Sequence, residues 1–215
     1  MSYPAESTGG DYFDYVPMPG GYQGVVVGDV SGHGIGSAVL MAETRAYLRA
    51  LALTRTEVGE ILALLNRALA SDIVRDYFVA LLLARLDPRT HSFVYASAGH
   101  SRGYVLDRSG GVKAVLVSTG RPVGIDPSDV FPASGPIALG PGDLVLLLTD
   151  GILEARAPDG AFFGSQRVLD LARVYRRHPA SQIAEEIFHS IRAFSQNLPQ
   201  DDDITAVVIK VEPPP

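Results

Sequence analysis

Strand-like runs separated by short turn signals are the feature that most constrains the fold of this chain of 215 residues. Each run is rich in Val, Leu and Tyr, which are favoured in strands. Several neighbouring runs are joined by turn-forming stretches such as PGG, RSGG and GPGD, which favour antiparallel hairpins. The runs cover residues 12–18, 22–30, 77–87, 92–99, 102–108, 113–118, 143–150 and 204–211.

Helical periodicity appears in segments inserted among these runs. The segments cover residues 36–53, 57–73, 165–178 and 179–196. Because the helices come in pairs and do not alternate with strands, we expect an α+β layered sandwich and no βαβ repeat. No linker interrupts the chain, so residues 1–212 are predicted to form a single domain, followed by a proline tail at 213–215.

Composition and charge argue against several classes of protein. Hydrophobic residues make up 47% of the chain and charged residues 20%, as in ordinary globular domains. The formal net charge is −6 and no Lys/Arg-rich run occurs, so we expect no binding to nucleic acid. The absence of cysteine excludes disulfides, zinc–thiolate sites and thiol catalysis. The apolar runs are too short for a membrane span and the first residues do not resemble a signal peptide, so we predict a soluble cytoplasmic domain without membrane contact.

Aspartates stand at the ends of three predicted strands. Asp29 ends the run GVVVGD and Asp150 ends LVLLLTD, each followed closely by glycine. Asp202 and Asp203 come directly before ITAVVIKV. If the last strand runs antiparallel to the other two, we expect all these acids at one edge of the sheet.

A hairpin adds a further carboxylate to this group. The turn PMPGG folds residues 11–16 back onto residues 22–29, so Asp11 is expected next to Asp29. Carboxylates a few ångströms apart raise each other's pKa unless cations neutralise them. Oxygen ligands without Cys or a paired-His motif favour Mg²⁺ or Mn²⁺ over Zn²⁺, and the spacing of a Ca²⁺-binding EF-hand is missing. Each aspartate by itself fits a turn former, whereas four at converging strand ends favour a metal site.

A glycine-rich loop, VSGHGIGSA, follows Asp29 and precedes the first long helix. Gly32 and Gly34 permit close approach of the main chain, and the N-terminus of the helix attracts anions. The loop has no Gly-Lys-Ser/Thr, and Ser37 stands where a dinucleotide-binding fingerprint requires its third glycine. By itself the loop is weak evidence of function, but beside a metal cluster it is expected to form a phosphate-binding rim.

Seven short motifs occur in the order in which one known family carries them. They are GGDYFD, DVSGHG, SAGH, GRPVGI, PGDLVLLLTDGILEA, FFG and DDDIT, and they span residues 9 to 205. Together they resemble the bacterial metal-dependent serine/threonine protein phosphatases of type 2C (the PPM type), in the branch of stage II sporulation protein E and the sigma-factor regulator RsbU. The resemblance implies a four-layer αββα sandwich, with two antiparallel sheets flanked by pairs of helices.

The resemblance also implies two Mn²⁺ or Mg²⁺ ions held by residues at matching positions. Asp29 would bridge both ions, with the carbonyl of Val30 as a main-chain ligand. Asp150 and Asp202 would hold the other ion, and Asp11 would act directly or through a bound water. Two aspartates of the motifs lie outside the family's main ligand positions: Asp14 and Asp203.

The implied reaction is the hydrolysis of phosphoserine or phosphothreonine by a hydroxide that bridges the two ions. The ions also stabilise the charge of the transition state. His33 is the best-placed acid for the leaving alkoxide, and it fits equally well as a rim residue of the glycine-rich loop. The predicted catalytic residues are therefore Asp29, His33 and Asp150. No phosphate-gripping arginine precedes Asp11, so specificity is expected to come from a docked protein surface.

The resemblance further indicates partners for the chain. The predicted substrate is a phosphorylated regulatory protein such as a STAS-type anti-sigma-factor antagonist, which implies a role in sigma-factor regulation and stress response. Relatives often carry upstream sensor domains, whose signal the helices at 36–53 and 57–73 are expected to receive. The stretch MSYPAEST is too short for the whole strand that precedes GGD in the family. The helix pair fits a homodimer interface or a core equally well. Two alternatives stay open, a non-catalytic pseudophosphatase that binds a regulatory partner and a metal-binding sensing domain.

Overall fold

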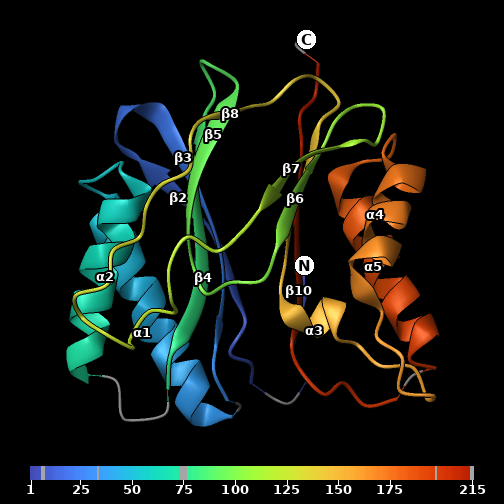
Figure 1. Cartoon of the computed structure of the whole chain (residues 1–215), viewed down its shortest axis with the longest axis horizontal. Helices are drawn as coiled ribbons and strands as arrows, with labels where there is room; N and C mark the ends of the chain where they lie inside the picture. The colour runs from blue at the N-terminus through green and yellow to red at the C-terminus, as the bar shows by residue number, and fades with distance from the viewer. Residues whose placement is uncertain (6–7, 33, 73–76, 197, 214–215) are drawn as a thin grey trace. The chain divides into compact units, whose positions relative to one another are not determined.

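The structure is a computed structural model and describes residues 1–5, 8–32, 34–72, 77–196 and 198–213 (Figure 1). Among these residues, no helix has the length and apolar character needed to cross a membrane. The described chain divides into two compact units, each with its own sheet and its own helices.

Each unit is named here after its pair of helices. The α1–α2 unit, with α1 (Ile35–Ala52) and α2 (Val58–Asp72), comprises Glu6–Ser101 and Val117–Leu139. The α4–α5 unit, with α4 (Gly164–Tyr175) and α5 (Ala180–Phe194), comprises Met1–Ala5, Arg102–Leu116 and Gly140–Pro215.

The sheet of the α1–α2 unit is antiparallel, with the strand order β2-β3-β4-β5-β8. Its strands are β2 (Tyr12–Met18), β3 (Tyr22–Val30), β4 (Val79–Asp87), β5 (Ser92–Ala98) and β8 (Ile137–Ala138). The β2–β3 hairpin turns through the 3-10 segment η1 (Pro19–Gly21), where Gly20 and Gly21 have φ of 74° and 79°. These positive φ values favour glycine, so the PGG turn sets the register that places Tyr12 opposite Gly28.

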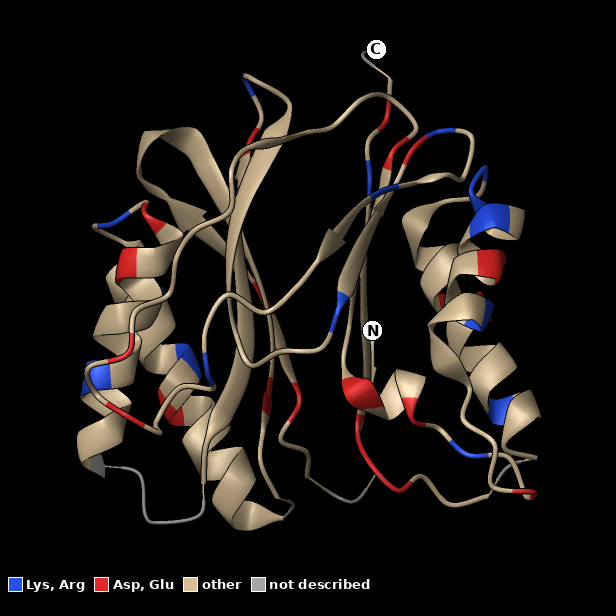
Figure 2. Ribbon diagram, viewed as in Figure 1, with Lys and Arg blue, Asp and Glu red and all other residues tan. Residues whose placement is uncertain are grey.

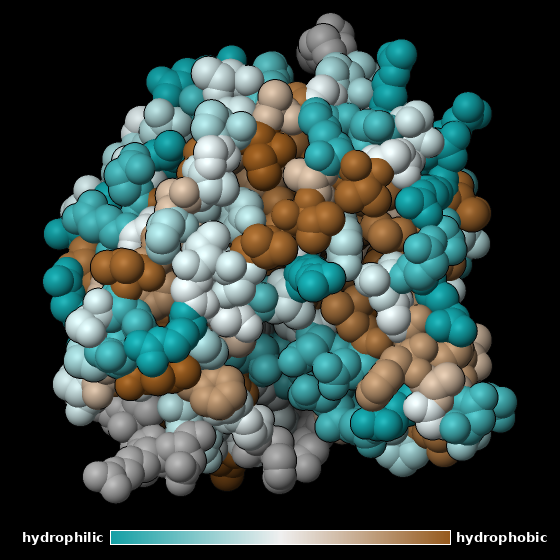
Figure 3. All heavy atoms as spheres, in the orientation of Figure 1, coloured by the Kyte–Doolittle hydropathy of each residue, from teal (hydrophilic) through white to brown (hydrophobic). Residues whose placement is uncertain are grey.

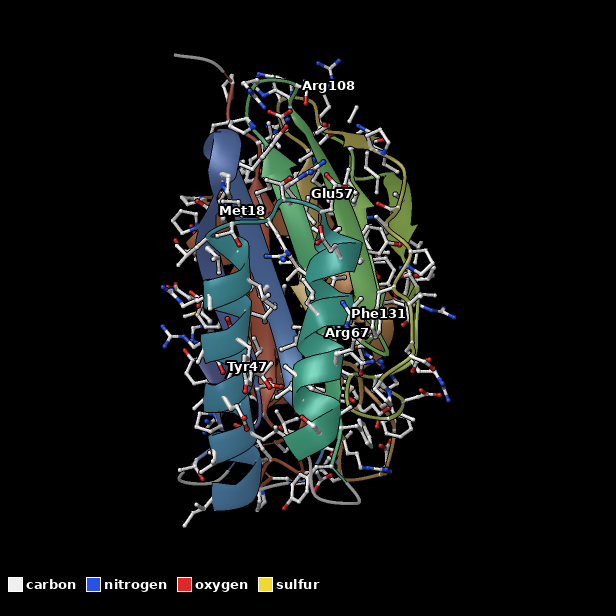
Figure 4. All side chains as sticks on the ribbon, turned by 90° about the vertical axis from the view of Figure 1, so that its left-hand side faces the viewer. Met18, Tyr47, Glu57, Arg67, Arg108 and Phe131 are labelled. Atoms are coloured by element: carbon white, nitrogen blue, oxygen red, sulfur yellow. The ribbon has the colours of Figure 1, made fainter. Side chains whose placement is uncertain are left out.

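Helices α1 and α2 lie side by side over one face of this sheet (Figures 1 and 4). Ile61, Leu65 and Leu69 recur at four-residue spacing along α2 and are fully buried against strand residues. Figure 4 views the unit from the helix side, with Tyr47 labelled on α1 and Arg67 on α2. Burial of each large aliphatic side chain contributes about 1.5–3 kcal/mol, so this stripe holds α2 in place.

The sheet of the α4–α5 unit is also antiparallel, in the order β1-β10-β9-β6-β7. Its elements besides α4 and α5 are β1 (Ser2–Tyr3), β6 (Gly103–Leu106), β7 (Val112–Leu116), β9 (Leu144–Leu148), α3 (Asp150–Leu153) and β10 (Ile204–Lys210). The N-terminal residues form β1 at the edge of the sheet, with Ser2 opposite Thr205. The main chains of Met1 and Ala206 exchange two hydrogen bonds of 2.9 Å, which extend this pairing.

Helices α4 and α5 pack on one face of this second sheet through an apolar stripe of their own. Val168 and Ala172 on α4, and Ile183, Ile187 and Ile191 on α5, are all buried at helical spacing. This stripe explains why two adjacent segments of modest length both form helices, since isolated helices of this size are marginal in water.

Strand β7 forms the other edge of the second sheet and exposes apolar side chains. Val112 and Val115 are 42% and 44% exposed, and Figure 3 shows apolar atoms in the region of this strand. Between them, Lys113 donates a hydrogen bond of 2.8 Å from Nζ to the carboxylate of Asp143. A lysine on an edge strand opposes pairing with another chain, so it limits aggregation at this exposed edge.

The predicted fold class is confirmed, because the chain forms an α+β fold of two antiparallel sheets with a pair of helices on each. One expectation is wrong: Asp29 and Asp150 do not lie at the edge of one sheet, since β3 belongs to one sheet and β9 and β10 to the other. The apolar pattern of a strand does not reveal its partner in the sheet. Three short elements, β1, β8 and α3, were not predicted because two to four residues carry no periodicity.

Candidate metal centre

Asp11 and Asp29 lie at the same end of the β2–β3 hairpin in the α1–α2 unit. The last paired residues there are Tyr12 and Gly28, so Asp11 and Asp29 come next on the two strands. The main-chain N–H of Val30 donates a hydrogen bond of 3.3 Å to the carbonyl of Gly10, which keeps the strands together beyond the ladder. Asp11 and Asp29 are both half-buried. The prediction that the PMPGG turn places Asp11 next to Asp29 is therefore confirmed.

Gly10 leaves room for the main chain of Val30. A Cβ atom at position 10 would lie 2.7 Å from the carbonyl oxygen of Val30 and 3.2 Å from Oδ1 of Asp29. The first separation is shorter than Cβ atoms show in proteins, so a larger residue would displace the main chain. Gly10, the second glycine of GGD, thus lets the carbonyl of Val30 and the carboxylate of Asp29, both predicted metal ligands, lie close to the main chain of residue 10.

Asp14 belongs to a separate ion cluster. Nε and Nη2 of Arg49 donate to its two carboxylate oxygens at 2.6 and 2.7 Å, and Nε of Arg45 lies 3.3 Å from one of them. The hydroxyl of Tyr12 donates to the same carboxylate at 3.1 Å. Burial raises the pKa of Asp14, but the hydrogen bonds from Arg49 and Tyr12 outweigh it and hold the pKa below its usual value. This carboxylate joins β2 to α1.

Asp150 and Asp202 come together in the α4–α5 unit. Strand β9 runs antiparallel to β10 and ends just before Asp150, which begins α3, while Asp202 lies two residues before β10. One carboxylate oxygen of each lies within 4.8 Å of the other. Figure 2 shows acidic residues where α3 begins and in the segment before β10. Thr149 and Thr205 hold the two segments together through main-chain and side-chain hydrogen bonds of 3.0 Å.

The electrostatic environment of Asp202 favours a bound cation. Burial is the largest cause of the raised pKa of Asp202, and the charges of Asp150 and Glu154 raise it further, against a main-chain hydrogen bond that lowers it. Glu154 was not among the predicted residues, although its position four residues after Asp150 places it one helical turn away. The donors are carboxylate oxygens alone, which fits Mg²⁺ or Mn²⁺.

Asp203 makes a contact with the main chain of Ala5. Its Oδ1 accepts a hydrogen bond of 2.7 Å from the main-chain N–H of Ala5, and the side chain is buried. This contact ties the segment before β10 to the residues that follow β1. Asp203 therefore has a structural contact within the α4–α5 unit.

The glycine-rich loop leads into α1, as the sequence predicts. Gly32 and Gly34 have φ of 84° and 83°, a conformation that favours glycine. Gly34 precedes the first residue of the helix, and its carbonyl accepts a hydrogen bond of 2.9 Å from the hydroxyl of Ser37. His33, the predicted acid, lies outside the described residues.

Comparison with known proteins identifies the family. Residues 19–212 match the family model of stage II sporulation protein E (SpoIIE). The chain belongs to the SpoIIE family. This match covers most of the chain and includes the ends of β3, β9 and β10, where Asp29, Asp150 and Asp202 lie.

Two curated relatives are similar along almost the whole of this SpoIIE-family chain. It is 26% identical to phosphoserine phosphatase RsbU of Bacillus subtilis, over 98% of this chain and 62% of the relative. It is 27% identical to protein IcfG of Synechocystis sp., over 96% of this chain and 36% of the relative. The chain thus spans less than two thirds of the length of either relative.

Solved structures share the fold. The SiaA-PP2C domain of Pseudomonas aeruginosa superposes with a TM-score of 0.87 at 25% identity, over 99% of this chain and 85% of that one. The RsbU and RsbW domains of a Mycobacterium tuberculosis protein give a TM-score of 0.83 at 25% identity, over 98% of this chain and 57% of that one. The SpoIIE-family chain therefore has the fold of PP2C-type phosphatase domains.

Proposed function

We propose that this chain is a metal-dependent protein phosphatase that hydrolyses phosphoserine or phosphothreonine on a regulatory protein. The observation that carries the proposal is the close pair Asp150 and Asp202, with the raised pKa of Asp202, in a chain of the SpoIIE family. Such a pair is unfavourable without a cation, and phosphatases of the PP2C type use divalent metal ions. The name of the relative RsbU, a phosphoserine phosphatase, supports the same activity.

The residues proposed to hold the ions are Asp11, Asp29, the carbonyl of Val30, Asp150 and Asp202. Divalent ions in this centre, two Mn²⁺ or Mg²⁺, supply acidification of water and neutralisation of phosphate charge. The carboxylates need no protein cation beside them once such ions are bound, since the ions balance their charge.

The residues of the chain then bind and orient the phosphorylated side chain. Gly32 and Gly34 would let main-chain N–H groups of the loop approach the phosphate, and the N-terminus of α1 would favour its negative charge. His33 would donate a proton to the oxygen of the leaving serine or threonine. Asp29 and Asp150 are the carboxylates on which the reaction depends most, because they stand at matching positions of the motifs DVSGHG and TDG.

The partner is proposed from the family resemblance. A phosphorylated STAS-type anti-sigma-factor antagonist would be the substrate, which places the chain in sigma-factor regulation and stress response in the cytoplasm. The relatives are longer than this chain, which fits an upstream sensor domain acting on α1 and α2. A homodimer through that helix pair is a further prediction.

Phosphate release from a phosphoserine STAS protein tests the proposal. We expect release with Mn²⁺ or Mg²⁺, no release with EDTA, and loss of release in Asp29→Asn. Asp170→Asn is a matched control, because Asp170 lies on α4 with a side chain 58% exposed and pairs with Arg173. Binding of Mn²⁺ and of the STAS protein without release under any condition would contradict the proposal and favour a pseudophosphatase.

A further inference from the structure

A groove of about 700 Å³ opens beside Asp202 within the α4–α5 unit. It is lined by residues of the segment that follows α3 and of the segment that joins α5 to β10. Its lining combines polar residues with apolar ones, among them Ala155, Pro158, Ile191 and Leu198. This volume accommodates a few amino-acid side chains, which is the size expected for a short peptide segment.

Arg156 is the one Lys or Arg side chain among the described residues that line this groove. Its guanidinium lies 4.5 Å from the ring centroid of Phe162 and its Nε lies 3.7 Å from a carboxylate oxygen of Asp201. The side chain is 53% exposed. Stacking on an aromatic ring limits the rotamers of the guanidinium, so the charge is held at the groove while its N–H groups stay accessible.

The segment that carries Arg156 is a tight hairpin. Arg156 and Phe162 form an isolated antiparallel bridge, and the N–H of Ala157 donates a hydrogen bond of 2.9 Å to the carbonyl of Ala161. Nη1 of Arg167, from α4, donates to the carbonyls of Phe162 and Phe163 at 3.1 and 2.7 Å. Arg156 is therefore anchored before any ligand binds, which lowers the entropy cost of using it.

The charges around the groove select the group that Arg156 can hold. Glu154, Asp201 and Asp202 also line it, so its walls carry more negative than positive charge. These carboxylates would repel an acidic peptide, whereas Arg156 could pair with a phosphate, and divalent ions held by Asp202, as proposed above, would attract it.

We propose that this groove binds the substrate segment that carries the phosphorylated side chain, with Arg156 pairing with the phosphate and the apolar lining residues contacting a neighbouring apolar side chain. The inference rests on the proposed function, since Asp202 is both a lining residue and a proposed metal ligand. A planar guanidinium can give a phosphate two parallel hydrogen bonds, which orient it as well as attract it.

The test compares steady-state kinetics of three substrates in the presence of Mn²⁺. They are a phosphoserine peptide flanked by leucines, the same peptide flanked by glutamates, and p-nitrophenyl phosphate. We expect Arg156→Ala to lower kcat/KM for all three by roughly tenfold or more, because all three carry the phosphate. Arg156→Lys should recover part of this loss, since it restores the charge but not the planar fork.

Two further variants separate the parts of the groove. Leu198→Ala should lower kcat/KM more for the leucine-flanked peptide than for the glutamate-flanked peptide or p-nitrophenyl phosphate, because Leu198 is one of the apolar residues that line the groove. Arg177→Ala is the control, because Arg177 is exposed at the end of α4 and does not line the groove. Equal kinetics of Arg156→Ala and Arg177→Ala would overturn the inference. A loss confined to the glutamate-flanked peptide would also overturn it, since Arg156 would then pair with the flank. Circular dichroism verifies that each variant is folded.

Binding distinguishes failure of this inference from failure of the proposed function. If the unmodified chain releases no phosphate, the proposed function fails and kinetics cannot test the groove. Fluorescence anisotropy of the labelled leucine-flanked phosphopeptide then decides, with Asp29→Asn as the common background. Binding weakened about tenfold by Arg156→Ala, and not by Arg177→Ala, supports the groove. Equal binding by Asp29→Asn alone, with Arg156→Ala and with Arg177→Ala, or no binding by any of the three, refutes the proposed groove.

Discussion

Replacing Gly10 by alanine tests whether the end of the β2–β3 hairpin holds a metal ion. The added Cβ would lie 2.7 Å from the carbonyl oxygen of Val30, whereas ordinary contact begins at 3.4 Å. The strands must therefore separate by about 0.7 Å, the difference between these two distances. The oxygen belongs to the main chain of Val30 and the Cβ atom is attached directly to the main chain of residue 10, so no rotamer change relieves the overlap.

The displacement is large compared with what a metal ligand tolerates. Ligand distances in metal sites hold to within about 0.2 Å, so a carbonyl displaced by several times that amount leaves its coordination position. We expect Mn²⁺ affinity to fall by about 10- to 100-fold, as for disturbed supporting groups of metal sites. Overpacking costs about 1–3 kcal/mol, and the lost freedom of glycine in the unfolded chain offsets about 0.4–1 kcal/mol of it. The net loss of about 1–2 kcal/mol lowers Tm by about 2–8 °C.

Isothermal titration calorimetry with Mn²⁺ and thermal unfolding with EDTA measure the two effects separately. Gly135→Ala is the matched control, because Gly135 belongs to the same unit, is exposed and has no atom within 4 Å of the place that an added Cβ would take. We expect this control to keep the Mn²⁺ affinity and Tm of the unmodified chain or to gain slightly in Tm. Equal Mn²⁺ affinity of the two variants would refute the assignment of Val30 and Asp29 as ligands.

Three further predictions concern stability. Asp14→Asn should lower the free energy of unfolding by about 1 kcal/mol, because the exposed Arg49 limits the strength of the ion pair. The pKa of Asp14 is lowered in the folded state, so this loss should be complete above about pH 4 and should vanish as the pH falls through the folded pKa. Urea unfolding of both proteins between pH 7 and pH 3 measures it. Asn66→Ala should cost about 2–3 kcal/mol, because the buried amide bonds two main-chain groups at 2.6 and 2.8 Å, and an unchanged urea midpoint would contradict this. Gly151→Ala should lower Tm by several degrees, because its Cβ would overlap the carbonyl of Asp203; a Tm equal to that of the unmodified chain would show that the main chain yields freely there.

The sequence by itself determined the local elements and the hairpins. Apolar alternation and helical periodicity depend only on neighbouring residues, so β2 and β3 begin and end where the pattern predicts. Helix α1 differs from its predicted range by one residue at each end, and α2 begins one residue later than predicted. The PGG turn sets a two-strand register, which was enough to place Asp11 beside Asp29. For Asp150 and Asp202, the sequence predicted a common edge only on the condition that the last strand runs antiparallel, as β10 does beside β9.

The tertiary structure alone decided how the strands divide into two sheets and which distant side chains meet. Strand β10 pairs with β1, from the opposite end of the chain, and Asp14 pairs with Arg49, 35 residues away. The groove likewise combines Arg156 with Leu198. No local pattern encodes these contacts, because an apolar strand face can be buried against many partners at similar cost. The choice among partners depends on the packing and loop closure of the whole chain, and it becomes visible only when the chain is folded.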